Sequence, residues 1–589
     1  MVKNVQATLT PKTFTLGVLL STFIFTGCQQ AVAPLKDGGM TSKEGVKLEA
    51  AIPANAAVII KLGTTDPGQV KMMKDLNAQF PSDLTKEFTT GFNEGFKSGA
   101  KFEEIGLNFE EDILPLVGEQ TEFVMAMAPG KKDGLNKPEI MASMTLANNA
   151  KFDALMAKLK DVTKEDYKGN VIYTAKSEDG SPNIFARYKD TVLLSDTAEN
   201  LKAMLDRVAS GESVIASKPG YAKAMKDMKP NLAMVYADLS AITSQMAADN
   251  PEEVQGMTKS LGMFGVPTDS LNVLDTEILF ATAEKDGIRM NASVYAKEGA
   301  DMSKLVTNGQ KIYLAKDVPG RTPLLYSEGQ GFKEAYQNIL SAMEGDEEMK
   351  QGMDEVRAGL KQVGLDFDQD VMGIMDKGIA MVLADNGSVV PSFGFYVDAS
   401  SKPDSAKKIA GVLNTLLTGG IAQMQAQNPE ASAFVEKQDI EADKLWKVKV
   451  NMDPLLMTAP EDIVKKLTGQ KVELYLGIVG NNVLALALHP DLEKSYAKGG
   501  DVVANANEFK RALEYIKGND LTVTYFAPAA VFDYLDRIMQ LAKDTGANID
   551  MTDYNEVRSL VRPVKSIVLG SSGFANGVAR SEIFVHIGQ

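Results

Sequence analysis

The chain has 589 residues and a net charge of −16 at pH 7, from 62 basic and 78 acidic side chains. A surface this acidic repels nucleic acids and anionic lipid head groups, so we expect no nucleic-acid partner. With 44% hydrophobic residues, the composition is that of a globular chain rather than a disordered one. The length predicts two to four domains.

Residues 1–27 have the pattern of a signal peptide. They contain Lys3 and Lys12, no acidic residue, and an apolar run over residues 13–27. As a helix this run would be about 22 Å long, which is short of the roughly 30 Å hydrocarbon core of a bilayer. It therefore fits a cleaved leader better than a membrane span. Removing a leader with two lysines and no acidic residue would take the net charge from −16 to −18.

The only cysteine of the chain, Cys28, directly follows this leader. The stretch "STFIFTGCQQ" resembles the lipobox of bacterial lipoproteins, although Phe25 stands where leucine is usual. The resemblance implies cleavage between Gly27 and Cys28 and a diacylglycerol on the Cys28 thiol, which anchors the protein to a membrane. The alternative is an uncleaved anchor in which Cys28 has no role. Gln29 resembles the outer-membrane sorting pattern.

We therefore expect a lipid-anchored protein of the cell envelope. In bacteria with two membranes it would lie on the periplasmic side of the outer membrane, and otherwise on the outer cell surface. A single cysteine cannot form an intramolecular disulfide, so the exported domains must be held by their cores.

After the leader, residues 28–48 are polar and predict a flexible tether that spans roughly 25 Å on average. The remaining chain looks duplicated, because five pairs of similar segments recur in the same order. The predicted copies are residues 49–300 and 317–589, with an insertion near 418–450 in the second. The pairs are found at Pro53 and Pro319, Gly106 and Gly364, Val192 and Val483, Tyr236 and Tyr525, and Gly287 and Gly577.

Each copy mixes strands and helices. Short runs rich in β-branched residues, such as "AAVIIKL", predict buried strands, and the apolar spacing over residues 149–161 predicts a helix. Asp196 with Glu199 predicts a capping box at the next helix, and the Asn-Gly pair at Asn576 favours a hairpin turn. We predict an α+β fold in which each copy is a mainly antiparallel sheet with helices packed on it.

Two stretches resemble a known family. They are "AAIPANAAVIIKLGTTDP" and "IGLNFEEDILPLVGEQTEFVMAMA", and the chain is similar on this basis to the domain of unknown function 3352 family of bacterial envelope proteins. The resemblance covers most of residues 50–589. It implies an envelope setting and provides no catalytic residues.

Motifs for catalysis or metal binding are weak. The two histidines, His489 and His586, are too few for most histidine-based metal sites, and no Gly-x-Ser-x-Gly elbow accompanies them. Gly63 and Gly68 have the spacing of a phosphate loop, but Gln69 stands where lysine is needed. We expect no cofactor and no metal.

Two Ser-x-x-Lys matches, Ser98 with Lys101 and Ser405 with Lys408, fit the pattern of penicillin-interacting serine enzymes. Neither is followed by a convincing partner motif. We therefore expect no enzyme activity.

Two acidic triplets could be read as metal ligands. In the second, Asp366 and the acids after it open like a calcium loop, but Val371 and Lys377 stand where the loop needs glycine and glutamate. Acids in the first turn of a helix are also stabilised by its dipole. We favour helix capping, with the matching pairs Glu110 and Asp368, and Asp112 and Asp370.

Methionine is frequent, with 29 residues. Met125, Met127, Met141 and Met144 are predicted to lie on adjacent strands, where they would line an apolar ligand cavity or fill a core.

The expected function is non-catalytic binding or scaffolding in the envelope. The alternative is a carrier of a lipid or another apolar ligand, and an envelope hydrolase comes third. A carrier predicts an apolar cavity of several hundred Å3, a scaffold predicts an exposed apolar patch, and an enzyme predicts converging polar groups with perturbed pKa values.

Overall fold

The computed structural model describes residues 46–588, except for the ranges given next. They are 82–113, 119, 133–134, 137, 159–161, 177–181, 227, 250–251, 253–269, 301–313, 343–346, 389, 430–434, 442–444, 452–470, 481, 490–491, 493–500, 517–520 and 545–550. The predicted leader, Gly27, Cys28, Glu110, Asp112 and the Ser98–Lys101 match lie outside the described residues.

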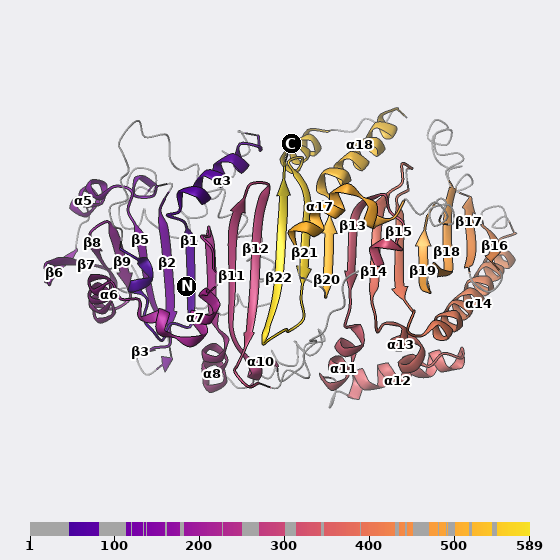
Figure 1. The fold of residues 1–589 in the computed structure, drawn as a ribbon, viewed down its shortest axis with the longest axis horizontal. Coiled ribbons are helices and arrows are strands. Elements are labelled where there is room, and N and C mark those ends of the chain that lie inside the picture. The colour runs from indigo at the N-terminus through magenta and orange to yellow at the C-terminus, as the bar shows by residue number, and fades with distance from the viewer. Residues whose placement is uncertain are drawn as a thin grey trace. The chain divides into compact units, whose positions relative to one another are not determined.

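The chain divides into two compact units. Unit 1 comprises Met1–Val254 and Leu274–Tyr295, and unit 2 comprises Gln255–Val273 and Ala296–Gln589. The predicted class is confirmed, since both units combine helices with an antiparallel sheet (Figure 1). None of the helices described here is both long enough and apolar enough to cross a membrane.

The sheet of unit 1 is antiparallel throughout, and β12 (Gly287–Ala296) follows β11 across a two-residue turn. The order of its other strands is β6 (Thr163–Tyr167), β7 (Asn170–Lys176), β8 (Pro182–Tyr188), β9 (Thr191–Ser195), β5 (Glu139–Thr145), β2 (Glu122–Ala128), β1 (Val58–Gly63), β10 (Ala233–Asp238) and β11 (Leu274–Glu284). A small ribbon, β3 (Lys131–Lys132) with β4 (Leu135–Asn136), lies in the connection between the paired strands β2 and β5.

The sheet of unit 2 is also antiparallel. Its order is β16 (Val435–Glu441), β17 (Leu445–Asn451), β18 (Lys471–Val479), β19 (Val483–Leu488), β15 (Ser392–Asp398), β14 (Ile379–Asp385), β13 (Thr322–Gly329), β20 (Thr522–Phe526), β21 (Val564–Ser571) and β22 (Val578–Ile587). When the strands of each unit are taken in chain order, as β1, β2 and β5–β12 in unit 1 and as β13–β22 in unit 2, the two sheets have the same strand order.

Helices join the strands in both units. Those of unit 1 are α3 (Pro67–Asn77), α5 (Asn149–Lys158), α6 (Ala198–Ser210), α7 (Pro219–Met225) and α8 (Leu239–Asp249), with short turns η2 (Leu48–Ala51), η5 (Leu114–Leu116) and η6 (Val214–Ser217). Those of unit 2 are α10 (Ser270–Val273), α11 (Phe332–Ala342), α12 (Glu347–Gln362), α13 (Met372–Ile374), α14 (Pro403–Gln427), α17 (Asn507–Tyr515), α18 (Pro528–Asp544) and α19 (Thr552–Val561), with η7 (Leu314–Lys316), η8 (Phe367–Val371) and η11 (Val503–Asn505).

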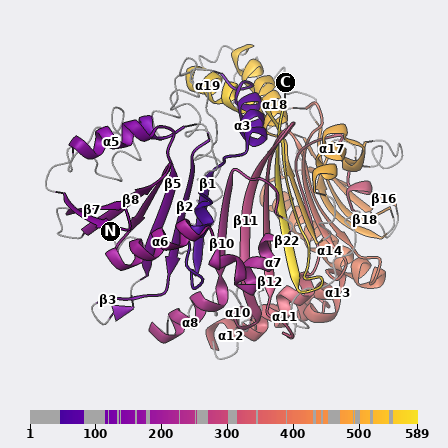
Figure 2. The ribbon, with the colours of Figure 1, turned by 60° about the vertical axis from the view of Figure 1, so that its left-hand side comes forward.

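Helix α6 shows how the sequence encodes these elements. It packs on β8 and β9, and Figure 2 shows it beside β8. Thr197 caps it by accepting a hydrogen bond from the Asn200 amide. The predicted cap, Asp196, is therefore wrong by one residue, because the threonine hydroxyl sits nearer the free amides of the first turn. Gly211, with φ 71°, ends the helix in the left-handed conformation. The buried residues of α6 recur at helical spacing, at Leu201, Met204, Leu205 and Val208.

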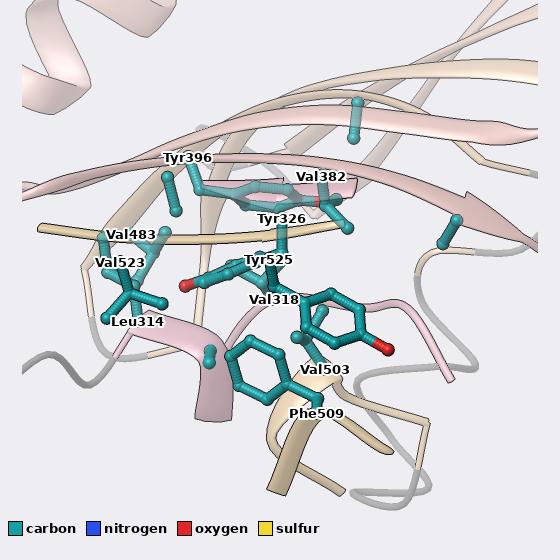
Figure 3. Close-up of a cluster of buried hydrophobic side chains, with 14 of the residues drawn as sticks. Leu314, Val318, Tyr326, Val382, Tyr396, Val483, Val503, Phe509, Val523 and Tyr525 are labelled. Carbon is teal, nitrogen blue, oxygen red and sulfur yellow. The ribbon is translucent and has the colours of Figure 1, made fainter. Parts of the chain in front are cut away.

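One face of the unit 2 sheet, which we call its core face, packs against α17 and η7 (Figure 3). The buried Phe509 ring of α17 makes edge-on contacts with Tyr326 and Tyr525, at centroid distances of 5.2 and 5.3 Å. The nearby Tyr396 ring lies over Gly394, where a Cβ would stand 2.4 Å from the ring. Only glycine fits there, so this residue places a large aromatic side chain in the core.

Candidate apolar binding site

The opposite face of the unit 2 sheet, its open face, is also apolar. A sheet with one solvated face normally carries polar side chains there. Here large apolar side chains stay exposed, including Phe393 at 46% and Leu486 at 45%, and exposed patches of this kind mark interaction sites. One row of neighbouring residues on this face crosses nine strands, and its first member is buried. The row is Val448, Leu474, Leu488, Phe393, Leu383, Leu325, Phe526, Ile567 and Val585.

Helix α14 forms a groove at one end of this open face. The start of the helix is anchored, because Ala406, Ile409 and Ala410 pack with Leu476 and Leu484 of the sheet. Farther along, the helix and the strands line a shallow, largely open groove of about 450 Å3. The groove is lined by Leu413, Leu416, Leu417, Gly420, Ile421 and Met424 of α14 and by Leu474, Leu476 and Leu486 of β18 and β19.

The lining of the groove is entirely apolar. Of the described residues that line it, none is charged and none carries a side-chain hydrogen-bonding group. On α14, the Thr415 and Thr418 hydroxyls bond to carbonyls of their own helix, at 3.0 and 2.7 Å. The volume is within the range of small-molecule sites, and the lining offers dispersion and hydrophobic contact only.

The Ser405–Lys408 match has a structural role at the base of α14. The Ser405 hydroxyl donates to Asp370 Oδ1 at 3.0 Å, and the Lys408 ammonium donates to Asp370 Oδ2 at 2.5 Å. The Asp366 amide also donates to Asp370, at 2.9 Å. Both members of the motif are thus held by one carboxylate, which joins α14 to η8.

The acids Asp366, Asp368 and Asp370 bind different partners. Asp366 caps η8 by accepting from the Gln369 amide at 2.8 Å, whereas Asp368 binds the Arg357 guanidinium of α12. Asp368 and Asp370 both lie in the first turn of η8, as the capping prediction requires. Asp370 also accepts the Asp366 amide. No group of three or more His, Cys, Asp or Glu residues in the described part of the chain could hold a metal ion.

Replacing Asp370 by asparagine is expected to lower the free energy of unfolding at pH 7 by about 1–3 kcal/mol, because a buried charged acceptor is lost. The Lys408 ammonium lowers the pKa of Asp370, so its contribution is full above the unfolded-state pKa and is lost as the pH falls through the folded value. The difference between the two proteins should therefore shrink below about pH 4. Urea unfolding at pH 7 and pH 3 measures it.

The control is Asp404→Asn on α14, the helix that carries Lys408. The Asp404 side chain is 98% exposed and lies 3.7 Å from Lys407, so its loss should change stability little at either pH. Equal effects of the two substitutions would contradict the assigned role of Asp370.

The two histidines lie far apart in the sheet order. His489 follows β19, and its amide donates to the Glu473 carbonyl, whereas His586 is buried in β22 with Glu508 at 3.6 Å. Five strands separate β19 from β22 in the sheet. The structure therefore does not bring the histidines together.

Buried carboxylates in unit 2 are matched by tyrosines. The Tyr326 hydroxyl donates to Glu328 at 2.6 Å, and the Leu314 amide donates to the same carboxyl at 3.1 Å. Burial raises the pKa of Glu328. Tyr475 and Glu473 form a second such pair at 2.5 Å. These bonds stabilise the core face, so both pairs serve the fold.

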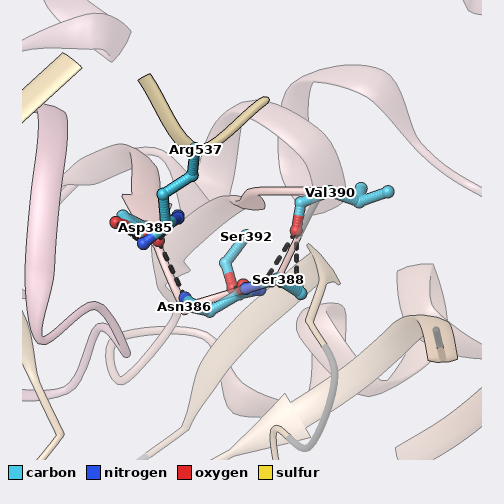
Figure 4. Close-up of polar contacts among 7 residues, drawn as sticks. Asp385, Asn386, Ser388, Val390, Ser392 and Arg537 are labelled. Atoms are coloured by element: carbon cyan, nitrogen blue, oxygen red, sulfur yellow. Dashed lines mark hydrogen bonds and ion pairs between the residues drawn. The ribbon is translucent and has the colours of Figure 1, made fainter. Parts of the chain in front are cut away.

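The connection between β14 and β15 is a closed polar loop (Figure 4). Arg537 of α18 binds both oxygens of Asp385, at 2.8 and 2.6 Å. The Asn386 amide group donates to Ser392, and the Ser388 hydroxyl donates to the Val390 carbonyl. The polar groups named here hold the loop and helix together, so we assign them no ligand.

The predicted methionine cluster is divided between the faces of the unit 1 sheet. Strands β2 and β5 are neighbours, as predicted. Met125, Met127 and Met144 are partly exposed on one face, whereas Met141 is buried in the core on the other. Met144 packs against the cluster that includes Phe152 and Leu155 of α5, so Met125 and Met127 are the two that contribute to the open part of this face.

Sequence analysis missed the groove. Its helix falls partly within residues 418–450, which we had assigned to an insertion. The signal was present, because the apolar residues of α14 continue at helical spacing from Leu413 to Met424, beyond the buried Ala410. An apolar stripe that continues beyond the buried part of a helix indicates an apolar surface that is not covered by the core.

Comparisons with known proteins place the chain in a family without a known role. A family model described as "Protein of unknown function (DUF3352)" matches residues 13–587, which confirms the resemblance predicted above. No curated protein matches. Two solved structures of 10% identity are "Structure of crystal form III of TP0453" and "Structure of crystal form I of TP0453". They cover 46% and 44% of this chain, and 91% and 82% of those chains, with TM-scores of 0.24 and 0.21, too low to establish a common fold.

Proposed function

The chain belongs to the DUF3352 family, whose function is unknown, and we propose that it binds hydrocarbon chains of a lipid or a similar apolar ligand. We propose further that a lipid on Cys28 anchors it in the cell envelope. The observation that carries the binding proposal is the uncharged groove of about 450 Å3 between α14 and strands β18 and β19.

Binding in a groove fits better here than general scaffolding. A protein interface usually surrounds its apolar centre with polar and charged groups, whereas this groove and the adjoining row of nine residues contain no charge. A hydrocarbon chain has no hydrogen bonds to satisfy, so an uncharged lining is its natural complement. Scaffolding through the exposed phenylalanines of β15 is the second candidate.

We also propose that the two units are related copies of one fold. This proposal is supported by the shared strand order and by similar exposure at positions that match in strand register, such as Leu194 at 39% and Leu486 at 45% on β9 and β19. This register differs by one residue from the predicted pair of Val192 and Val483. The helix that follows β5 has 10 residues, whereas its counterpart α14 has 25. The extra length of α14 forms the groove, so the site would be specific to the second copy.

Native mass spectrometry of the full-length protein, extracted in a mild detergent that is stripped off in the gas phase, tests the function. We expect an added mass of lipid size that is released on denaturation. Bare protein, together with no uptake of a fluorescent long-chain fatty acid, would refute hydrocarbon binding and leave scaffolding as the better candidate.

Replacing Cys28 by serine is expected to abolish lipid labelling, since an oxygen cannot take the place of the thiol in the thioether. Metabolic labelling with palmitate followed by membrane fractionation measures this: wild type should carry label in the membrane fraction, and Cys28→Ser should be unlabelled with its leader uncleaved. Gln29→Ala is the matched control and should label normally. Equal labelling of Cys28→Ser and wild type would refute the anchor.

A further inference from the structure

The two halves of helix α14 are buried to different extents. In the first half, Ala406, Ile409 and Ala410 are buried. From Gly411 to the end of the helix no residue is buried, and Leu416 is 55% exposed. Residues 411–427, which we call the arm, are therefore held in place by the backbone hydrogen bonds of the helix and by partial packing along the groove.

Glycine weakens the arm at three places. Gly411, Gly419 and Gly420 lie within the helix, where glycine is less favourable than every residue except proline. A Cβ at any of the three would meet nothing within 4 Å. Packing therefore does not require glycine at these positions, and its effect is to make the helix easier to bend.

Closing the arm would bury apolar surface. Leu413, Leu416 and Met424 line the groove but remain 39%, 55% and 38% exposed. An apolar chain in the groove would fill the space that these side chains face, so an occupied groove favours the closed arm. Segments with few buried contacts are also those that open locally at low cost.

We propose that the arm opens and closes the groove by bending at Gly411 and at Gly419–Gly420, and thereby controls the entry and release of the hydrocarbon chain. This inference rests on the proposed function for its ligand, but the motion belongs to the helix itself. The arm is open for exchange and closed over the bound chain.

The test uses the double variant Gly411→Ala/Gly419→Ala. Neither residue lines the groove, whereas Gly420 does, so the variant stiffens the arm and leaves the site unchanged. Because each substitution favours the helix about fourfold, we expect hydrogen exchange within the arm to slow roughly tenfold or more. Stopped-flow binding of a fluorescent long-chain fatty acid should show association and release slowed by a similar factor, with a small change in Kd.

The matched control is Gly352→Ala/Gly359→Ala in α12. Both glycines are helical, and a Cβ at either would meet nothing within 4 Å. This variant should leave the arm's exchange and the binding rates unchanged.

Hydrogen exchange also separates the two proposals. In wild type, amides of the arm should exchange faster than those of Ile409 and Ala410. Equal protection, or unchanged arm exchange in the stiffened variant, would overturn the moving arm even if the fatty acid binds. Fast arm exchange that slows in the variant, without any fatty-acid binding, would support the arm and refute the hydrocarbon ligand.

Discussion

Replacing Phe509 by alanine is expected to destabilise unit 2 by about 3–5 kcal/mol, the usual cost of removing a buried phenylalanine. Phe509 is fully buried, and its ring lies edge-on between Tyr326 and Tyr525. Its removal leaves a cavity between α17 and the sheet and ends both aromatic contacts. Urea unfolding, with hydrogen exchange of β13 and β20 as the local readout, measures the loss.

Phe395→Ala is the matched control. It deletes the same ring in the same unit, but Phe395 lies on the open face and is 38% exposed. Its substitution should cost well under half as much, since most of the lost surface is already in contact with water. Equal losses would mean that the core face does not hold the unit 2 sheet together.

The difference between these two phenylalanines shows how far sequence reasoning extends. Alternation and β-branched runs predicted strands such as β1 correctly, and the antiparallel class followed from them. However, strand β15 carries apolar residues on both faces, so its sequence alone does not say which face is covered. The answer depends on where α14 and α17 pack, which is set by contacts between distant segments.

Local chemistry was predictable where the partners are close in sequence. The Asn-Gly turn is one example, since Asn576 and Gly577 both adopt positive φ, at 51° and 74°. Asp370 is the contrary case. It accepts the predicted local amide, but its strongest partner, Lys408, is 38 residues away. The sequence analysis discounted Ser405 and Lys408 as a catalytic pair on motif grounds, and in the structure both side chains donate to the Asp370 carboxylate.

Replacing Leu486 by glutamate is expected to weaken fatty-acid binding roughly 100-fold or more, if the groove is the binding site. Leu486 lies on β19 in the floor of the groove. A bound chain would cover the new carboxylate, so binding loses the contact of one leucine and must also remove a charge from water. Because Leu486 is already 45% exposed in the free protein, the substitution should change its stability little. Titration of the fluorescent fatty acid gives the Kd.

Leu194→Glu separates this effect from a general effect of added charge. Leu194 occupies the equivalent position on β9 of unit 1, with 39% exposure, but is not among the residues that line the groove. Both variants gain the same negative charge on an already acidic protein, so repulsion of the fatty acid should be similar. We expect near wild-type affinity for Leu194→Glu. If both variants lose binding equally, the ligand is not held by the α14 groove.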